Sequence, residues 1–132
     1  MDNELPIIEG INTEKGLVHC GGSLDAYVEV LESFLEDSTA KIREMKPFQK
    51  KNITALNDTE LHHFASSVHS IKGVAAIIGV QGLSKKAAGL EKAAKVADRK
   101  IIQRDFPGFF EDLKATTQRV QSFLKNNSGS EV

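Results

Sequence analysis

The chain has 132 residues, 40% of them hydrophobic and 27% charged, which is the length and composition of one globular domain with a single core. Seventeen basic against eighteen acidic residues give a net charge of −1, so there is no overall attraction to nucleic acid or acidic lipid. A single cysteine excludes an intramolecular disulfide and fits a reducing compartment.

The sequence also favours a cytoplasmic location. No apolar run approaches the roughly 18 residues that a membrane-spanning helix needs. The first residues, MDNELPIIEG, lack the charged and apolar regions of a signal peptide. Aromatic side chains that could stack on bases are few, with no Trp and one Tyr. We therefore expect a cytoplasmic protein that binds neither membranes nor nucleic acid.

Residues 1–22 are predicted to form a lead-in and a short helix. The short helix is expected between Thr13 and Cys20, where two glycines follow and end it. His19 and Cys20 are adjacent in it, and neighbours on a helix diverge by about 100°, so this pair is not expected to share a metal ion.

Four longer helices are predicted within residues 23–126, because apolar residues recur there three and four positions apart. They are expected from a Ser23 cap to Pro47, from an Asn57 or Asp58 cap to Gly79, from about Val80 to Asp98, and from an Asp105 cap to about Asn126. One apolar stripe per helix and short joins are typical of an antiparallel bundle. The predicted fold is therefore all-α, an antiparallel four-helix bundle with a short N-terminal helix. Because each stripe is buried internally, we expect a monomer.

The start of the last helix is predicted from its proline. Residues 99–104 are interpreted as a short join, and Pro107 would lie in the first turn after Asp105, where its missing N–H does no harm. The polar residues 127–132 are expected to form a disordered tail.

The most unusual stretch is residues 61–79, LHHFASSVHSIKGVAAIIG. Its apolar stripe consists of Leu61, Phe64, Val68, Ile71, Ala75 and Ile78. His69 falls beside this stripe. The residues one or two turns away on the same flank are Ala65, Ser66, Lys72, Gly73 and Ala76. The histidine is therefore surrounded by small side chains and one lysine.

Two of these neighbours indicate a use for the histidine. Gly73 lies in the helix interior, where glycine costs about 0.5–1 kcal/mol relative to alanine, and its missing Cβ lets another surface approach His69. Lys72 can bring its ammonium group beside an anion carried by the imidazole. The combination predicts a docking site for an anion at His69.

Residues 69–79, HSIKGVAAIIG, resemble the H-x-[LI]-K-G-x-[SA]-x-x-[LIF]-G signature of histidine-containing phosphotransfer (HPt) domains, the intermediate carriers of multistep phosphorelays. The likeness extends to residues on both sides: Leu31, Phe34 and Leu35 upstream, and Leu83, Ala87, Leu90 and Glu91 in an L-x-x-x-A-x-x-L-E continuation. One departure is Val74, where the family usually has Ser, Ala or Thr. A β-branched residue there would narrow the approach to the histidine but removes no required group.

The resemblance implies that His69 takes a phosphoryl group from a receiver-domain aspartate and passes it to another. It implies that the distal ring nitrogen carries the group and that Lys72 screens the phosphate charge. It also implies that small residues leave room for the partner, namely Ala65, Ser66, Gly73 and Ala76. The expected partners are receiver domains of response regulators or of a hybrid histidine kinase.

The chain carries no motif for using ATP. It has no P-loop, no glycine-rich nucleotide motif and no acidic cluster near His69 in sequence that could hold Mg²⁺. In the family, the receiver domain supplies the aspartate and Mg²⁺. We therefore expect a phosphoryl carrier with no cofactor of its own, completed by a receiver or kinase partner, and not an enzyme by itself.

Two alternatives stay open. The chain could be the phosphoacceptor domain of a chemotaxis-type histidine kinase, phosphorylated by an ATP-binding domain elsewhere in a longer chain. It could be a helical adaptor without phosphate chemistry. A zinc site at His62 and His63 is disfavoured, because His62 lies seven helical residues, or about 10 Å, from His69, and His63 faces elsewhere.

Overall fold

The computed structural model describes residues 5–50 and 52–129. In the second range, the backbone is described to Gly129 and the side chains to Asn126. Its helices are α1 (Thr13–His19), α2 (Leu24–Met45), α3 (Asp58–Ile78), α4 (Gln81–Lys95) and α5 (Arg99–Gly129). Two 3₁₀ helices, η1 (Lys46–Gln49) and η2 (Ile53–Ala55), lie between α2 and α3.

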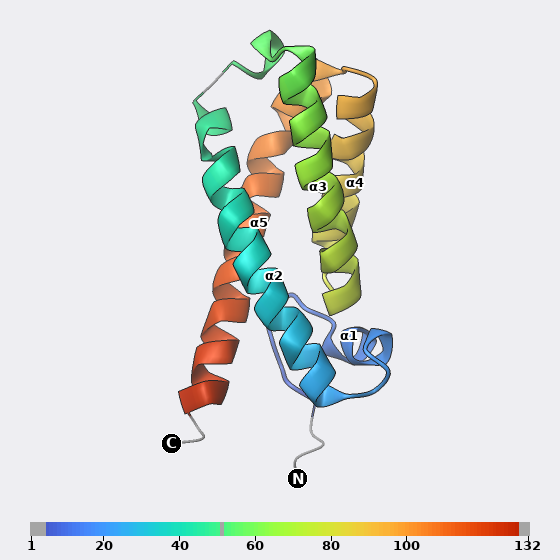
Figure 1. Ribbon diagram of the computed structural model, residues 1–132, viewed down its shortest axis with the longest axis vertical. Helices are drawn as coiled ribbons and strands as arrows, with labels where there is room; N and C mark the ends of the chain where they lie inside the picture. The colour runs from blue at the N-terminus through green and yellow to red at the C-terminus, as the bar shows by residue number, and fades with distance from the viewer. Residues whose placement is uncertain (1–4, 51, 130–132) are drawn as a thin grey trace.

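Helices α2 to α5 run alternately up and down the molecule, and α1 lies near the end where α2 begins and α3 ends (Figure 1). The predicted all-α bundle with a short N-terminal helix is confirmed. None of the described helices combines the length and apolar character needed to cross a membrane.

Two of the long helices begin at caps that the sequence supplies. The Ser23 side chain accepts a hydrogen bond from the Ala26 N–H at the start of α2. At the start of α3, Asn57 and Glu60 exchange the two bonds of a capping box. Gly79 then ends α3 in the left-handed conformation, with φ at +99°. The predicted starts of α2 and α3 and the stop of α3 are confirmed.

The core fixes how α3 is rotated. All six apolar residues of its predicted stripe are buried: Leu61, Phe64, Val68, Ile71, Ala75 and Ile78. The Phe64 ring packs between aromatic rings of other elements, 5.7 Å from Phe48 of η1 and 5.9 Å from Phe106 of α5 between centroids. Since this face is held inward, the flank that carries His69 is turned to the outside.

The last helix differs from the prediction at both ends. It starts at Arg99, capped by the Asp98 side chain, which accepts from the Ile101 N–H at 3.2 Å. Residues 99–104 are helical rather than a join because Ile102 is fully buried there, and this packing outweighs the proline signal. Pro107 therefore lies inside α5 on its exposed face, where water can reach the carbonyl that its missing N–H leaves free.

The helix also extends into the segment predicted as a disordered tail. Its backbone is helical to Gly129, because an established helix adds further residues at little cost. Residues 130–132 lie outside the described residues. The preceding helix, predicted to reach Asp98, is shorter than expected: α4 stops at Lys95, and Ala97 is exposed with φ at +57°, because the chain turns there to reach the Asp98 cap.

Candidate functional site

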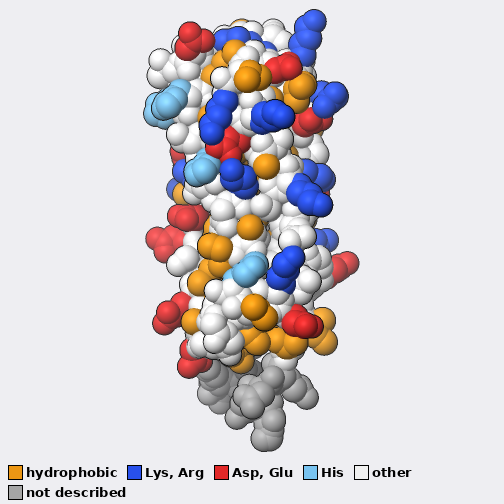
Figure 2. All heavy atoms as spheres, turned by 90° about the vertical axis from the view of Figure 1, so that its right-hand side faces the viewer, with side chains coloured by type: hydrophobic (Ala, Val, Ile, Leu, Met, Phe, Trp, Pro, Cys, Tyr) orange, Lys and Arg blue, Asp and Glu red, His pale blue; other side chains and the backbone are white. Residues whose placement is uncertain are grey.

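His69 lies halfway along α3 with 64% of its side chain exposed. Figure 2 shows the side of the bundle on which α4 lies in Figure 1, and basic side chains gather there beside histidines. The ring is therefore accessible from solvent on a face rich in positive charge.

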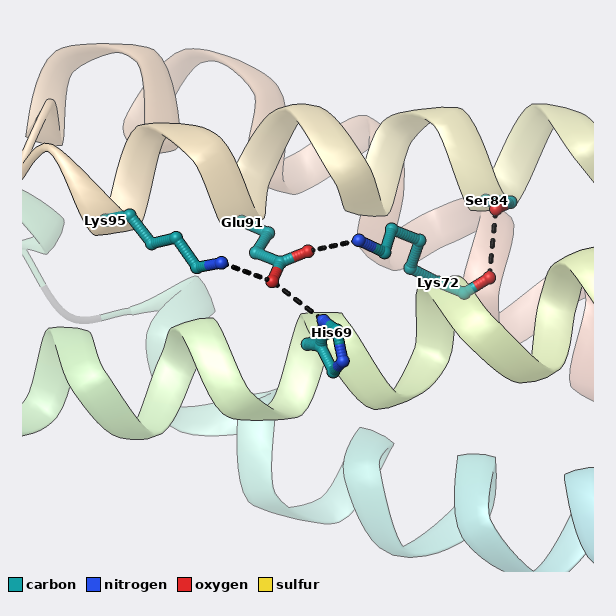
Figure 3. A network of polar contacts seen from close by, with 5 residues as sticks. All are labelled: His69, Lys72, Ser84, Glu91 and Lys95. Carbon is teal, nitrogen blue, oxygen red and sulfur yellow. Dashed lines mark hydrogen bonds and ion pairs between the residues drawn. The ribbon is translucent and has the colours of Figure 1, made fainter.

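The imidazole is held by a carboxylate from the neighbouring helix. His69 Nδ1 lies 2.8 Å from Glu91 Oε2 on α4. Lys72 Nζ lies 2.7 Å from the other oxygen, Oε1, and Lys95 Nζ lies 3.0 Å from Oε2 (Figure 3). The Glu91 side chain is only 6% exposed, so three donors surround a buried acid.

These donors keep Glu91 ionised. The hydrogen bond from Lys72, followed by those from Lys95 and His69, lowers the pKa of Glu91 to about 2 against the opposing effect of burial. An ionised carboxylate only accepts, so Nδ1 of His69 carries the proton of their hydrogen bond. In the neutral ring the lone pair then belongs to Nε2, which is directed away from Glu91 in Figure 3. The distal nitrogen is left as the available nucleophile.

The close packing of α3 and α4 brings Glu91 to the ring. The buried face of α4 includes Ala87 and Ala94, whose small side chains let the two helices approach. Glu91 follows the buried Leu90 and so lies at the edge of that face. Ser84 of α4 also donates to the Lys72 carbonyl at 2.9 Å, which ties the two helices together one turn past His69.

The small residues predicted around His69 lie on two sides of it. Ala65 and Ser66 line a shallow hollow of about 400 Å³ together with His62, His69, Glu91 and Lys95. On the other side, a Cβ added to Gly73 would meet no neighbouring atom within 4 Å, so the space there is open. Ala76 is half-buried on the next turn and does not line the hollow.

The contacts of Glu91 with His69, Lys72 and Lys95 were not predicted from the sequence. Glu91 belongs to the family resemblance but lies 22 residues from His69, beyond the reach of a local motif. The sequence feature that could have indicated these contacts is Glu91 beside the apolar stripe of α4, with Lys95 four residues later. Such a pair also occurs on ordinary helix surfaces, and only the packing of α3 against α4 gives it a role.

A metal ion has no ready set of ligands at His69. Within residues 5–50 and 52–129, no three His, Cys, Asp or Glu side chains are grouped to hold one. Both oxygens of Glu91 already meet Lys72, Lys95 or His69, so the residues present do not fit Mg²⁺. His62 lines the hollow beside His69, but among the described residues the two histidines are not part of a group that could hold a metal ion.

Comparison with protein-family models matches residues 29–127, which are 99 of the 132 residues, to the Hpt domain. Searches of curated proteins and of solved structures gave no match. The matched region contains Glu91 and the three residues bonded to it, His69, Lys72 and Lys95, whereas α1 precedes it. The signature, the helical bundle and the exposed histidine agree with this match, and the chain belongs to the Hpt domain family of phosphotransfer modules.

Proposed function

We propose that His69 accepts a phosphoryl group on Nε2 from a receiver-domain aspartate and passes it to another such aspartate. Hpt domains typically interact with receiver domains. The observation that carries the proposal is an exposed imidazole whose Nδ1 is engaged by Glu91 and whose Nε2 is turned outward. The chain would act as a carrier whose catalysis is completed by its partner.

In the transfer step, the Nε2 lone pair of His69 attacks the phosphorus atom of the aspartyl phosphate. The N–P bond forms as the P–O bond to the aspartate breaks, and the aspartate leaves as a carboxylate. No proton has to move, because Nδ1 keeps its hydrogen and the ring takes up positive charge. The ionised Glu91, 2.8 Å from Nδ1, stabilises that charge and holds the ring in one orientation. The same geometry serves the reverse step.

The residues around the ring fit this role. The Lys72 ammonium group, only 35% exposed, offers positive charge to the phosphoryl oxygens. The open space at Gly73 gives the partner a path to Nε2. We propose that Mg²⁺ comes with the receiver domain, and the engagement of both Glu91 oxygens by donors of this chain supports that division.

The test is transfer of radioactive phosphate from a phosphorylated receiver domain in the presence of Mg²⁺. We expect one acid-labile, alkali-stable label on the protein, lost in His69→Gln. His62→Gln and His63→Gln are matched controls, because both histidines are exposed on the same helix, and both variants should keep the label. Label that survives in a folded His69→Gln protein would assign the chemistry to another residue.

A further inference from the structure

Two lysines share a single carboxylate beside His69. Lys72 meets Oε1 of Glu91, and Lys95 meets Oε2, the same oxygen that accepts from His69. One negative and two positive charges leave this cluster with a net positive charge while the ring is neutral. Such a balance favours an additional anion next to the ring.

The two lysines differ in their freedom to move. Lys72 has a side chain that is 35% exposed, and its backbone carbonyl is bonded to Ser84. Lys95 is the last residue of α4, and 66% of its side chain is exposed. An exposed lysine on a flexible stem changes partner at little cost, because water replaces the contact it gives up. Lys95 is therefore the cation that can be redirected.

Lys95 also lies beside the ring, and its exposed, flexible stem can turn from Glu91 toward a group on Nε2. Its Nζ and His69 Nδ1 contact the same Glu91 oxygen, so the two nitrogens are no further apart than 3.0 Å plus 2.8 Å. Lys95 and His69 line the same hollow, where Ala65 and Ser66 leave room for phosphoryl oxygens. In Figure 3, Lys95 and Lys72 approach Glu91 from opposite sides.

We infer that Lys95 leaves Glu91 and binds the phosphoryl oxygens when His69 is phosphorylated, which makes it a second phosphate-binding lysine of the site. The inference rests on the proposed function and deepens it. Lys95 would stabilise the phosphorylated form of this protein relative to the phosphorylated receiver. It would thus set the fraction of phosphoryl groups that stays on His69 at equilibrium with the receiver.

The experiment compares Lys95→Met with Lys92→Met, a matched control that removes an exposed lysine of the same helix. Each variant is equilibrated with one phosphorylated receiver and Mg²⁺, and the phosphohistidine is titrated with pH by ³¹P NMR. Lys95→Met should shift the equilibrium about three- to tenfold toward the receiver and raise the pKa of the phosphoryl group. Lys95→Arg should restore both values, because it keeps the charge.

The two proposals can fail separately. If Lys95→Met matches Lys92→Met in both the equilibrium and the titration while His69 is labelled, the inference about Lys95 is wrong and the carrier function stands. If His69 of the unsubstituted protein takes no label, the carrier function itself is wrong. Circular dichroism checks that each variant keeps its helices, and Lys95→Gln repeats the test with a polar side chain if Lys95→Met loses them.

Discussion

At the residue scale, the proposed role of His69 as phosphoryl acceptor depends on a buried acid, Glu91. Glu91 accepts from Nδ1 of the ring and is itself held by Lys72 and Lys95. Because the carboxylate fixes the proton on Nδ1, the lone pair stays on the exposed Nε2. We therefore propose that Glu91 is a positioning residue for the nucleophile.

Replacing Glu91 with glutamine should slow transfer without unfolding the bundle. The amide removes the negative charge that fixes the Nδ1–H tautomer and stabilises the positively charged ring. We expect the rate of single-turnover transfer from a phosphorylated receiver to fall at least about tenfold. ¹⁵N NMR should show a smaller fraction of His69 protonated on Nδ1. Glu29→Gln, on the exposed surface of α2, is the control, and equal rates for the two variants would contradict this role.

The low pKa of Glu91 predicts how stability depends on pH. Its pKa is about 2 in the folded protein against an ordinary value of 4.5, so ionised Glu91 favours the folded state. This contribution is complete above pH 4.5 and is lost as the pH falls toward 2. Urea unfolding of the protein and of Glu91→Gln should therefore give free energies that differ near neutral pH and converge toward pH 2. A difference that stays constant over this range would refute the assignment.

Gly73 offers a test of access that is separate from stability. A leucine there meets no neighbour at Cβ and replaces a poor helix former, so Gly73→Leu should raise the free energy of unfolding by about 0.5–1 kcal/mol. The same side chain would obstruct the partner one turn from the ring and slow transfer. Gly108→Leu, at another open position in α5, should gain stability without slower transfer. Unchanged transfer in Gly73→Leu would show that this space is not the route of approach.

The sequence predicted only part of this site. His69, Lys72 and Gly73 lie within one helical turn or so of each other, so a local pattern was enough to find them. Glu91 and Lys95 come from another helix, and their roles depend on the distance between α3 and α4. No local rule fixes that distance.

At the element scale, the segment before the family match caps the end of α3. The carbonyls of residues 77–79 accept from His19 Nδ1 at 3.1 Å, the Tyr27 hydroxyl at 2.8 Å and the Asn12 N–H at 2.8 Å. These are carbonyls that a helix end leaves without partners inside the helix. Gly16 makes the contact possible, since a Cβ there would lie 2.6 Å from the Ile78 carbonyl oxygen. The N-terminal segment thus holds the last turn of the helix that carries His69.

Tyr27→Phe tests this cap with one atom removed. The fully buried hydroxyl donates to Ile78, and its loss leaves that carbonyl without the bond, so we expect a cost of about 1–2 kcal/mol in the free energy of unfolding.

Burial, and to a lesser degree Cys20, raises the pKa of Tyr27 to about 12 from 10.0. The stability due to the protonated hydroxyl is therefore complete below pH 10 and lost as the pH rises through 12. Denaturant unfolding measures both effects, and a variant as stable as the unsubstituted protein would contradict them.

The boundaries of the helices were predictable where they depend on local signals. Asn57 and Gly79 delimit α3 through a capping box and a left-handed residue, and both can be identified from neighbouring residues alone. The start of α5 was not predictable in this way. Pro107 suggested a helix beginning at Asp105, whereas burial of Ile102 in the assembled bundle extends the helix back to Arg99.

At the scale of the whole molecule, the bundle buries its own apolar stripes. The large hydrophobic side chains left exposed among the described residues are scattered over several elements: Leu5, Ile7, Val18, Ile77 and Val96. We therefore expect sedimentation equilibrium to give the monomer mass of 14.4 kDa at micromolar concentration. A mass twice as large would mean that one of these surfaces pairs with a second copy.

We propose above all that the phosphoryl group is carried by Nε2 of His69. The most direct measurement is ³¹P and ¹⁵N NMR of the protein after phosphorylation by a receiver domain, with its histidines labelled with ¹⁵N. We expect one phosphohistidine, with phosphorus bonded to Nε2 of His69 and hydrogen retained on Nδ1. Phosphorus on Nδ1 of His69, or on His19, His62 or His63, would contradict it.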